Sequence, residues 1–213
     1  MGYKAVIFDL DGVICHTDRY HYSAWKEIAD EIGVYFDEKI NNNLRGISRK
    51  ESLEIILRNY KKTLTQEQKN YYLSKKNELY KDMLKSLSPL DIDPIVLETI
   101  KKIKEANIKT AIASSSRNAK LILNQLGLEK TFDAVVDGND IRRSKPDPEV
   151  FLKASSFLNI PPKDCLVVED AESGVRAAHA AGMDCAAIGD ATKYNLAKYS
   201  LIHLSDLLNI LSA

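Results

Sequence analysis

The chain has 213 residues, 45% of them hydrophobic and 28% charged, which is typical of a globular protein with one large domain or with a core and a small second domain. Its 30 basic residues equal its 30 acidic ones, so no net charge favours binding to nucleic acid or to an anionic membrane. Because it has only three cysteines, no apolar run long enough to span a bilayer and no signal-peptide pattern, we expect a cytoplasmic protein without disulfides.

The first predicted element is a buried strand over residues 5–8, which is followed by Asp9 and Asp11. Side chains two positions apart on an extended chain point to the same side, so these two carboxylates repel unless a cation or a shared proton intervenes. The pair is therefore a candidate metal or phosphoryl site. A strand followed by an ordinary Asp-Gly turn explains the stretch equally well when it is taken alone.

Helical patterns follow over residues 17–86. One amphipathic helix is expected to end at Gly33, and capping boxes beginning at Ser48 and Thr65 predict two more helices. Because this segment separates the first strand from the others, we predict a mobile helical domain over 17–86 and a core domain formed by 1–16 and 87–213. The basic pair at 75–76 is interpreted as part of a solvated helix face.

From Pro94 onward, predicted helices and strands alternate. The strands are expected over 109–113, 133–136, 165–168 and 185–188, with a helix before or after each of them. Such alternation is typical of an α/β protein with a doubly wound parallel sheet and right-handed crossovers. The predicted fold is therefore an α/β core with an inserted α-helical domain.

Polar residues follow the last apolar residue of three predicted strands: Asp9, Ser114 and the pair Glu169-Asp170. The carboxyl ends of parallel strands share one sheet edge, where open α/β sheets bind their ligands. Taken singly, Ser114 fits a helix cap, Lys145 a solvated residue before a proline turn, and Glu169-Asp170 a helix start. Their common placement instead predicts a site, and three carboxylates suit Mg²⁺, which prefers oxygen ligands.

Phosphoryl transfer fits these residue types. Lys145 and the Ser114 hydroxyl would balance the charge of the phosphoryl oxygens, and Asp9 is placed to attack phosphorus and form an aspartyl phosphate. Asp11 would carry the proton of the leaving or attacking oxygen.

The motifs that carry these residues resemble those of the haloacid dehalogenase superfamily of aspartate-nucleophile phosphotransferases. They are Asp9-Leu10-Asp11-Gly12-Val13, Ser114 after its strand, Lys145-Pro146-Asp147-Pro148, and Val168-Glu169-Asp170 with Gly174 beyond. The resemblance implies a Rossmann-like core and a helical cap inserted after the first strand. It also implies Mg²⁺ held by Asp9, the main-chain oxygen of Asp11 and Asp170, to which the residue types alone add Glu169 as the third carboxylate.

Further segments resemble the β-phosphoglucomutase family within that superfamily: Thr17, Tyr20-His21, Ala24-Trp25, residues 44–53 and residues 113–118. By this resemblance, Arg49 with Ser116, Arg117 and Asn118 would grip the phosphate that is not transferred, His21 would hold Asp11, and Thr17 would serve the hinge. The full set of implied substrate-binding residues is Thr17, His21, Trp25, Arg45, Gly46, Arg49, Ser115, Ser116, Arg117 and Asn118. From the residues alone, Arg49 fits a surface position, His21 a structural one, and Trp25 cap packing.

The expected activity is interconversion of β-glucose 1-phosphate and glucose 6-phosphate through phospho-Asp9 and a glucose 1,6-bisphosphate intermediate, in a monomer whose partner is the sugar phosphate. Two other readings stay open: a sugar-phosphate phosphatase of the same superfamily, and a noncatalytic module that senses phosphate. A cap that grips the second phosphate and excludes water would favour the mutase.

Overall fold

The computed structural model describes residues 2–212 and contains a six-stranded, all-parallel sheet. The strands are β1 Ala5–Phe8, β2 Lys109–Ala113, β3 Ala134–Val136, β4 Cys165–Glu169, β5 Asp184–Ala187 and β6 Tyr199–Ser200. Their spatial order is β3-β2-β1-β4-β5-β6, so the direction of winding reverses between β1 and β4. The predicted doubly wound α/β fold is therefore confirmed, and ligand crevices of such sheets form at this switch point.

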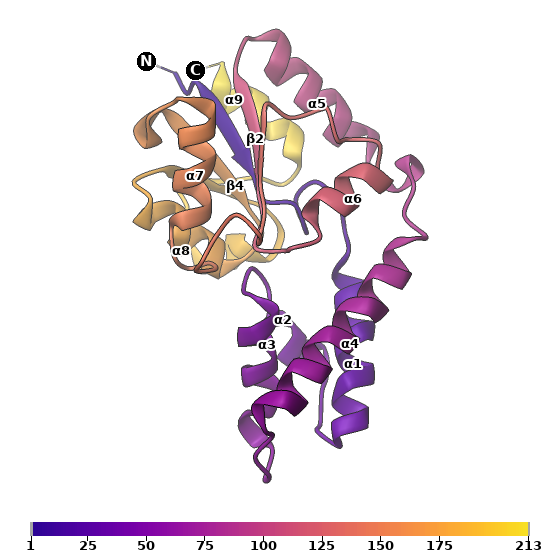
Figure 1. Ribbon diagram of the computed structural model, residues 1–213. Helices are drawn as coiled ribbons and strands as arrows, with labels where there is room; N and C mark the ends of the chain where they lie inside the picture. The colour runs from indigo at the N-terminus through magenta and orange to yellow at the C-terminus, as the bar shows by residue number, and fades with distance from the viewer. Residues whose placement is uncertain (1, 213) are drawn as a thin grey trace.

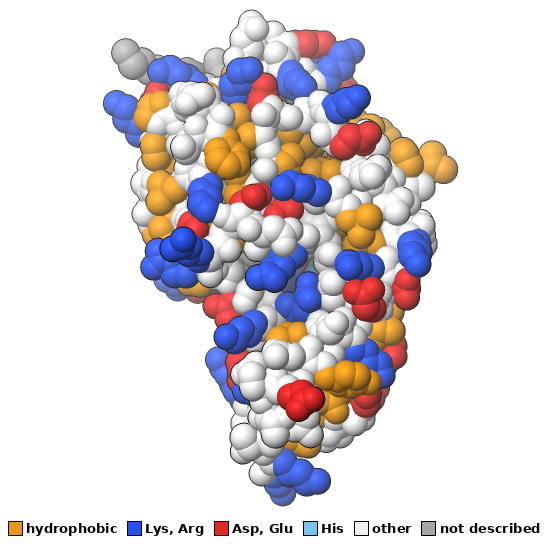
Figure 2. Space-filling model, in the orientation of Figure 1, with side chains coloured by type: hydrophobic (Ala, Val, Ile, Leu, Met, Phe, Trp, Pro, Cys, Tyr) orange, Lys and Arg blue, Asp and Glu red, His pale blue; other side chains and the backbone are white. Residues whose placement is uncertain are grey.

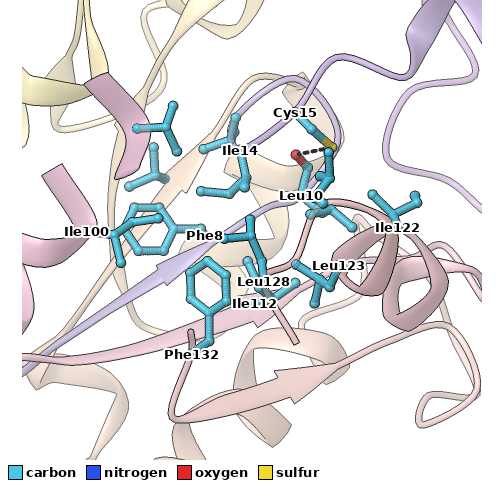
Figure 3. Packing of buried hydrophobic residues seen from close by; sticks show 14 of the residues in the cluster. Phe8, Leu10, Ile14, Cys15, Ile100, Ile112, Ile122, Leu123, Leu128 and Phe132 are labelled. Atoms are coloured by element: carbon cyan, nitrogen blue, oxygen red, sulfur yellow. Dashed lines mark hydrogen bonds between the residues drawn. The ribbon is translucent and has the colours of Figure 1, made fainter. Parts of the chain in front are cut away.

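Helices cover both faces of the sheet, and the strand residues alternate between them (Figure 1). On one face, Phe8 and its neighbours pack against α5 (Pro94–Glu105), α6 (Ala119–Gln125) and α9 (Leu207–Leu211). Figure 3 shows this cluster, in which the ring centroids of Phe8 and Phe132 are 6.2 Å apart. On the other face, Ile7 and its neighbours pack against two further helices, α7 Glu149–Leu158 and α8 Glu172–Ala180. Because both faces are covered, the central strands are apolar at consecutive positions.

The inserted segment forms a bundle beside the carboxyl edge of the sheet (Figure 1). Its helices are α1 Asp18–Ile32, α2 Glu38–Asn42, α3 Arg49–Ile56 and α4 Gln66–Leu84. The expected ends are present: α1 stops at Gly33, whose φ of 80° suits glycine, and both predicted capping boxes form at the starts of α3 and α4. Tyr80 of α4 packs with the cluster around Phe8 rather than with the cluster formed by the inserted helices. The limits of the two domains, 17–86 for the inserted one, therefore stay a prediction.

Short elements account for most differences from the sequence-based expectation. α2, α9 and the two-residue β6 are too short to produce a readable period, and they were not predicted. The remaining short helices are η1 Leu57–Asn59, η2 Pro89–Asp91, η3 Pro162–Asp164, η4 Gly189–Tyr194 and η5 Leu204–Asp206. The three cysteines are buried and unpaired, as expected. No helix within residues 2–212 is both long and apolar enough to cross a membrane.

Candidate active site

Three buried carboxylates meet at the switch point of the sheet. β1 and β4 are neighbours with Phe8 opposite Val168, so Asp9 and Glu169 leave the sheet side by side, and Asp170 follows. One oxygen from each of the three carboxylates lies within 4.8 Å of the others. Gly12, with a φ of 92°, gives the space for this approach, because a Cβ at that position would overlap the Asp170 carboxylate.

Lys145 lies beneath these carboxylates and is completely buried. Its Nζ forms ion pairs with Asp9 and Glu169 and donates to the carbonyl oxygen of Ala113 at 3.0 Å. Burial opposes the charged ammonium, but the two carboxylates outweigh it and raise the pKa of Lys145. The interpretation of Lys145 as a solvated residue before a turn is thereby excluded.

The charges of this cluster are unbalanced without a further cation. Burial, with the nearby Glu169 carboxylate, raises the pKa of Asp9 to about 8 and that of Asp170 to about 9. Three carboxylates thus share the ammonium of Lys145 and the more distant guanidinium of Arg45, which lies 3.6 Å from Asp170. Glu169 is fixed by the N–H groups of Asp170 and Ala171, at 3.0 and 3.1 Å from its Oε2. This all-oxygen donor set with surplus negative charge fits Mg²⁺.

Mg²⁺ is expected to stabilise the folded protein, because a ligand that binds only the folded state raises its stability. At a concentration of about 100 Kd the gain is about 2.7 kcal/mol, or a rise in Tm of about 5 to 10 °C for a chain of this size. Differential scanning fluorimetry with increasing MgCl₂ measures the shift. Asp170→Asn should lose most of it, and an equal shift in the variant would place the ion elsewhere.

Asp11 is held by Thr17, whose hydroxyl donates to the Asp11 carboxylate and lies 3.0 Å from the hydroxyl of Tyr80. Burial raises the pKa of Asp11 to about 6, against which the Thr17 hydrogen bond acts. A carboxyl group with this pKa exchanges protons close to neutral pH, as a general acid and base must.

We expected His21 to contact Asp11, but the structure shows a different partner. His21 Nδ1 instead lies 2.9 Å from Lys76 Nζ, and burial together with Lys76 and Arg49 lowers the pKa of His21 well below its usual range. The interpretation of Lys76 as solvated was wrong: Lys76 is 2% exposed. Burial and the neighbouring Arg49 also lower its pKa well below the usual range of lysine. Lys76 is thus a site residue that the sequence reasoning missed.

A cavity of about 430 Å³ lies between the sheet edge and the inserted helices. Most of the predicted site residues line it: Asp9, Asp11, His21, Trp25, Arg45, Gly46, Arg49, Ser114, Ser115, Ser116, Arg117, Asn118, Glu169 and Asp170. Thr17 and Lys145 are fully buried and are not among its lining residues, so Thr17 contacts Asp11 rather than the cavity. Trp25 is 2% exposed and packs in the helical core, as its position on α1 indicated.

Basic side chains also line the cavity. They are Arg49, Arg117 and Lys76, of which Lys76 lies close enough to Asp11 to affect its pKa, and Figure 2 shows Lys and Arg side chains around the hollow between the two parts of the molecule. Burial and Arg117 lower the pKa of Arg49, which indicates that these cations repel each other. An anion bound between them would relieve that repulsion.

Arg45 joins the inserted segment to the core at the rim of the cavity. Its guanidinium pairs with Asp18, lies 3.0 Å from Asp190 of η4 and 3.6 Å from Asp170, and its carbonyl oxygen accepts from Ser173 Oγ at 3.0 Å. These contacts with acidic side chains differ from the expected role in binding an anionic substrate. No sequence pattern indicated Asp190, which lies 145 residues from Arg45.

Comparison with known proteins shows the family to which the chain belongs. The model of the haloacid dehalogenase-like hydrolases matches residues 3–182. The chain belongs to this family. The family match contains every strand-edge carboxylate described above, together with Ser114 and Lys145, whereas β5, β6 and α9 lie beyond it.

Individual relatives within the family include isomerases and hydrolases. The chain is 44% identical over 188 residues to a β-phosphoglucomutase of Bacillus subtilis, covering 87% of this chain and 83% of the relative. It is 34% identical over 192 residues to a phosphorylated carbohydrates phosphatase of Thermotoga maritima, covering 85% and 82%. The crystal structure of a β-phosphoglucomutase from Clostridium difficile superposes with a TM-score of 0.91 at 36% identity, covering 96% of this chain and 93% of that one.

Proposed function

We propose that this protein is a β-phosphoglucomutase, which interconverts β-glucose 1-phosphate and glucose 6-phosphate through β-glucose 1,6-bisphosphate. The observation that carries the proposal is the single cavity with charged side chains of both signs. Asp9, backed by the buried Lys145, and Asp11 line the cavity for the phosphate that is transferred, and Arg49 and Arg117 line it for a second phosphate. A mutase must hold both phosphates of a bisphosphate, whereas hydrolysis of a monophosphate requires one phosphate site.

In the proposed reaction, an Asp9 carboxylate oxygen forms a bond to phosphorus while the bond from phosphorus to the sugar oxygen breaks. Asp11 supplies the proton to the departing oxygen, and it removes the proton of the other hydroxyl when that hydroxyl attacks phospho-Asp9. Lys145 holds Asp9 in place and offsets the charge of the phosphoryl oxygens, with the Ser114 hydroxyl beside it. Mg²⁺, held by Asp9, Asp170 and their neighbours, would reduce the repulsion between the two anions.

The test is to incubate the protein with Mg²⁺, β-glucose 1-phosphate and a trace of glucose 1,6-bisphosphate, and to follow glucose 6-phosphate and free phosphate together. The proposal expects glucose 6-phosphate in large excess over free phosphate. Fast phosphate release without isomer would instead support a sugar-phosphate phosphatase, the activity for which the relative from Thermotoga maritima is named.

The contact between Arg45 and Asp190 is expected to favour the sugar over water as the acceptor, because it ties the inserted segment to the core at the cavity rim. Asp190→Asn should raise the ratio of free phosphate to glucose 6-phosphate by about two- to fivefold, as expected for loss of one partly exposed ion pair. Lys193→Met is the matched control, since it removes the other partner of Asp190 and leaves Arg45 in place. An equal ratio of free phosphate to glucose 6-phosphate in both variants would contradict this role.

The cytoplasmic location and the monomeric state of the protein stay predictions.

A further inference from the structure

We propose that Gly138 and Asn139, which follow β3, position the Ser115–Asn118 loop and thereby set the affinity for the phosphate that is not transferred. The inference rests on the proposed function, because it takes this loop as one wall of the second phosphate site. Neither residue was a candidate from the sequence. They are positioning residues, since they act through the loop.

Two hydrogen bonds join the segments. The N–H of Gly138 donates to the carbonyl oxygen of Ser116 at 3.0 Å, and the Asn139 side-chain amide donates to the carbonyl oxygen of Arg117 at 3.0 Å. The orientation of two consecutive peptide groups in the loop is therefore fixed from outside it. The Arg117 side chain extends from one of these peptide groups into the positive part of the cavity.

The space between the segments admits only glycine at position 138. A Cβ there would overlap the carbonyl oxygen of Ser115 and lie 3.0 Å from the backbone nitrogen of Arg117. Both atoms belong to the backbone, so neither can be displaced by a simple rotation of a side chain. A side chain at 138 would therefore move the loop itself.

The segment that carries Gly138 is held by hydrogen bonds of its own. Asp137 is fully buried, its Oδ1 accepts from the N–H of Asn139 at 2.8 Å, and its own N–H donates to Asp140 Oδ2 at 3.0 Å. Lys120 Nζ lies 3.7 Å from Asp137 and 3.6 Å from Asp140, which ties the segment to α6 on the far side of the loop. The loop is thus supported by a turn that holds its own shape.

Ser114 is anchored differently from the rest of the loop. Its N–H donates to the carbonyl oxygen of Val136 at 3.0 Å, as a continuation of the pairing between β2 and β3. The Ser114 hydroxyl also accepts from the N–H of Ser116 at 3.1 Å, whereas Asp9 is held by Lys145. A change at 138 or 139 should therefore move Ser115–Asn118 most, affect the Ser114 hydroxyl less, and leave Asp9 in place. The expected signature is weaker binding of a bisphosphate, with little change in the phosphorylation of Asp9 by a donor that has no second phosphate.

The experiment compares Gly138→Ala and Asn139→Ala with wild type on two substrates. KM for glucose 1,6-bisphosphate is measured with β-glucose 1-phosphate present as the acceptor of the phosphoryl group. Both glucose 6-phosphate formation and phosphate release are followed, so that the comparison holds for a mutase and for a phosphatase. We expect KM to rise about two- to tenfold for Asn139→Ala, which loses one hydrogen bond, and at least about tenfold for Gly138→Ala, which displaces the loop. Phosphorylation of Asp9 by acetyl phosphate should change less than about twofold, because Asp9 is held by Lys145 and the backbone of Ser114 by Val136.

Gly2→Ala and Asn209→Ala are the matched controls: a Cβ at Gly2 would meet nothing within 4 Å, and Asn209 is exposed. Asn139→Asp gives a further check, since it keeps the side-chain shape but replaces the donor by an acceptor, and it should weaken bisphosphate binding more than Asn139→Ala. If Gly138→Ala does not fold, the KM values of Asn139→Ala and Asn139→Asp test the inference instead.

An unchanged KM, or an equal fall of both activities together with Tm, would overturn the inference by showing that the segment is only structural. Failure of the proposed function is a separate result, because it appears in the wild-type protein as the absence of glucose 6-phosphate.

Discussion

Asp9→Asn is expected to lower turnover of β-glucose 1-phosphate by about 10⁴ to 10⁶-fold, the range found when an enzymatic nucleophile is removed. An amide has nearly the shape of the carboxylate but cannot attack phosphorus at a useful rate. The variant should fold, because Lys145 keeps its ion pair with Glu169 and the repulsion between Asp9 and Glu169 is removed. The coupled assay for glucose 6-phosphate measures the loss.

The control for this variant is Asp164→Asn, which removes an aspartate that pairs with Lys4 on the protein surface. Its turnover should stay within about twofold of wild type, as is usual for surface substitutions. Incubation with a radiolabelled phosphoryl donor adds a direct readout, since Asp9→Asn should retain no label after denaturation while the control does. Turnover of Asp9→Asn above about one per cent of wild type would contradict the nucleophilic role.

Much of the site follows from the order of the chain. Consecutive apolar residues at 5–8 and 165–168 require strands buried on both faces, and parallel strands bring Asp9, Ser114 and Glu169 to one edge. The structure places them there. The residue types then limit the chemistry, because three carboxylates with one buried lysine suit few reactions other than those of a metal and a phosphate.

Residues whose environment depends on helix packing were harder to predict. Lys76 belongs to a basic pair, which normally indicates a solvated face, yet it lies one turn before Tyr80 and two turns before Leu84 on the buried side of α4. That spacing was the available signal. No sequence signal indicated the contact between Arg45 and Asp190, because the loop between α2 and α3 meets η4 only in the folded protein. Gly138 likewise contacts its loop through the pairing of β2 with β3.

Lys145→Met is expected to have the second large effect, on both turnover and stability. Turnover should fall about 10² to 10⁴-fold, because the electrostatic stabilisation of the phosphoryl group is lost. Removal of one partner from a buried ion pair typically lowers the free energy of unfolding by about 3 to 5 kcal/mol. Here Asp9 and Glu169 would both lose their cation. Urea unfolding without Mg²⁺ measures the change, and Lys101→Met, at an exposed position, should cost less than about 0.5 kcal/mol.

The stability loss of Lys145→Met should depend on pH in a defined direction. Burial already raises the pKa of Asp9 to about 8 in the native protein, whereas an unfolded aspartate has a pKa of about 3.9. Between these values the native state binds more protons than the unfolded state, so the contribution of Asp9 to stability falls as pH rises through this window. Without Lys145 the native pKa rises further, and the loss should be larger at pH 8 than at pH 5. A loss that is equal at both pH values would contradict the coupling between Lys145 and the titration of Asp9. Packing does not confuse the test, because the side chain of methionine preserves most of the volume of lysine but none of its charge.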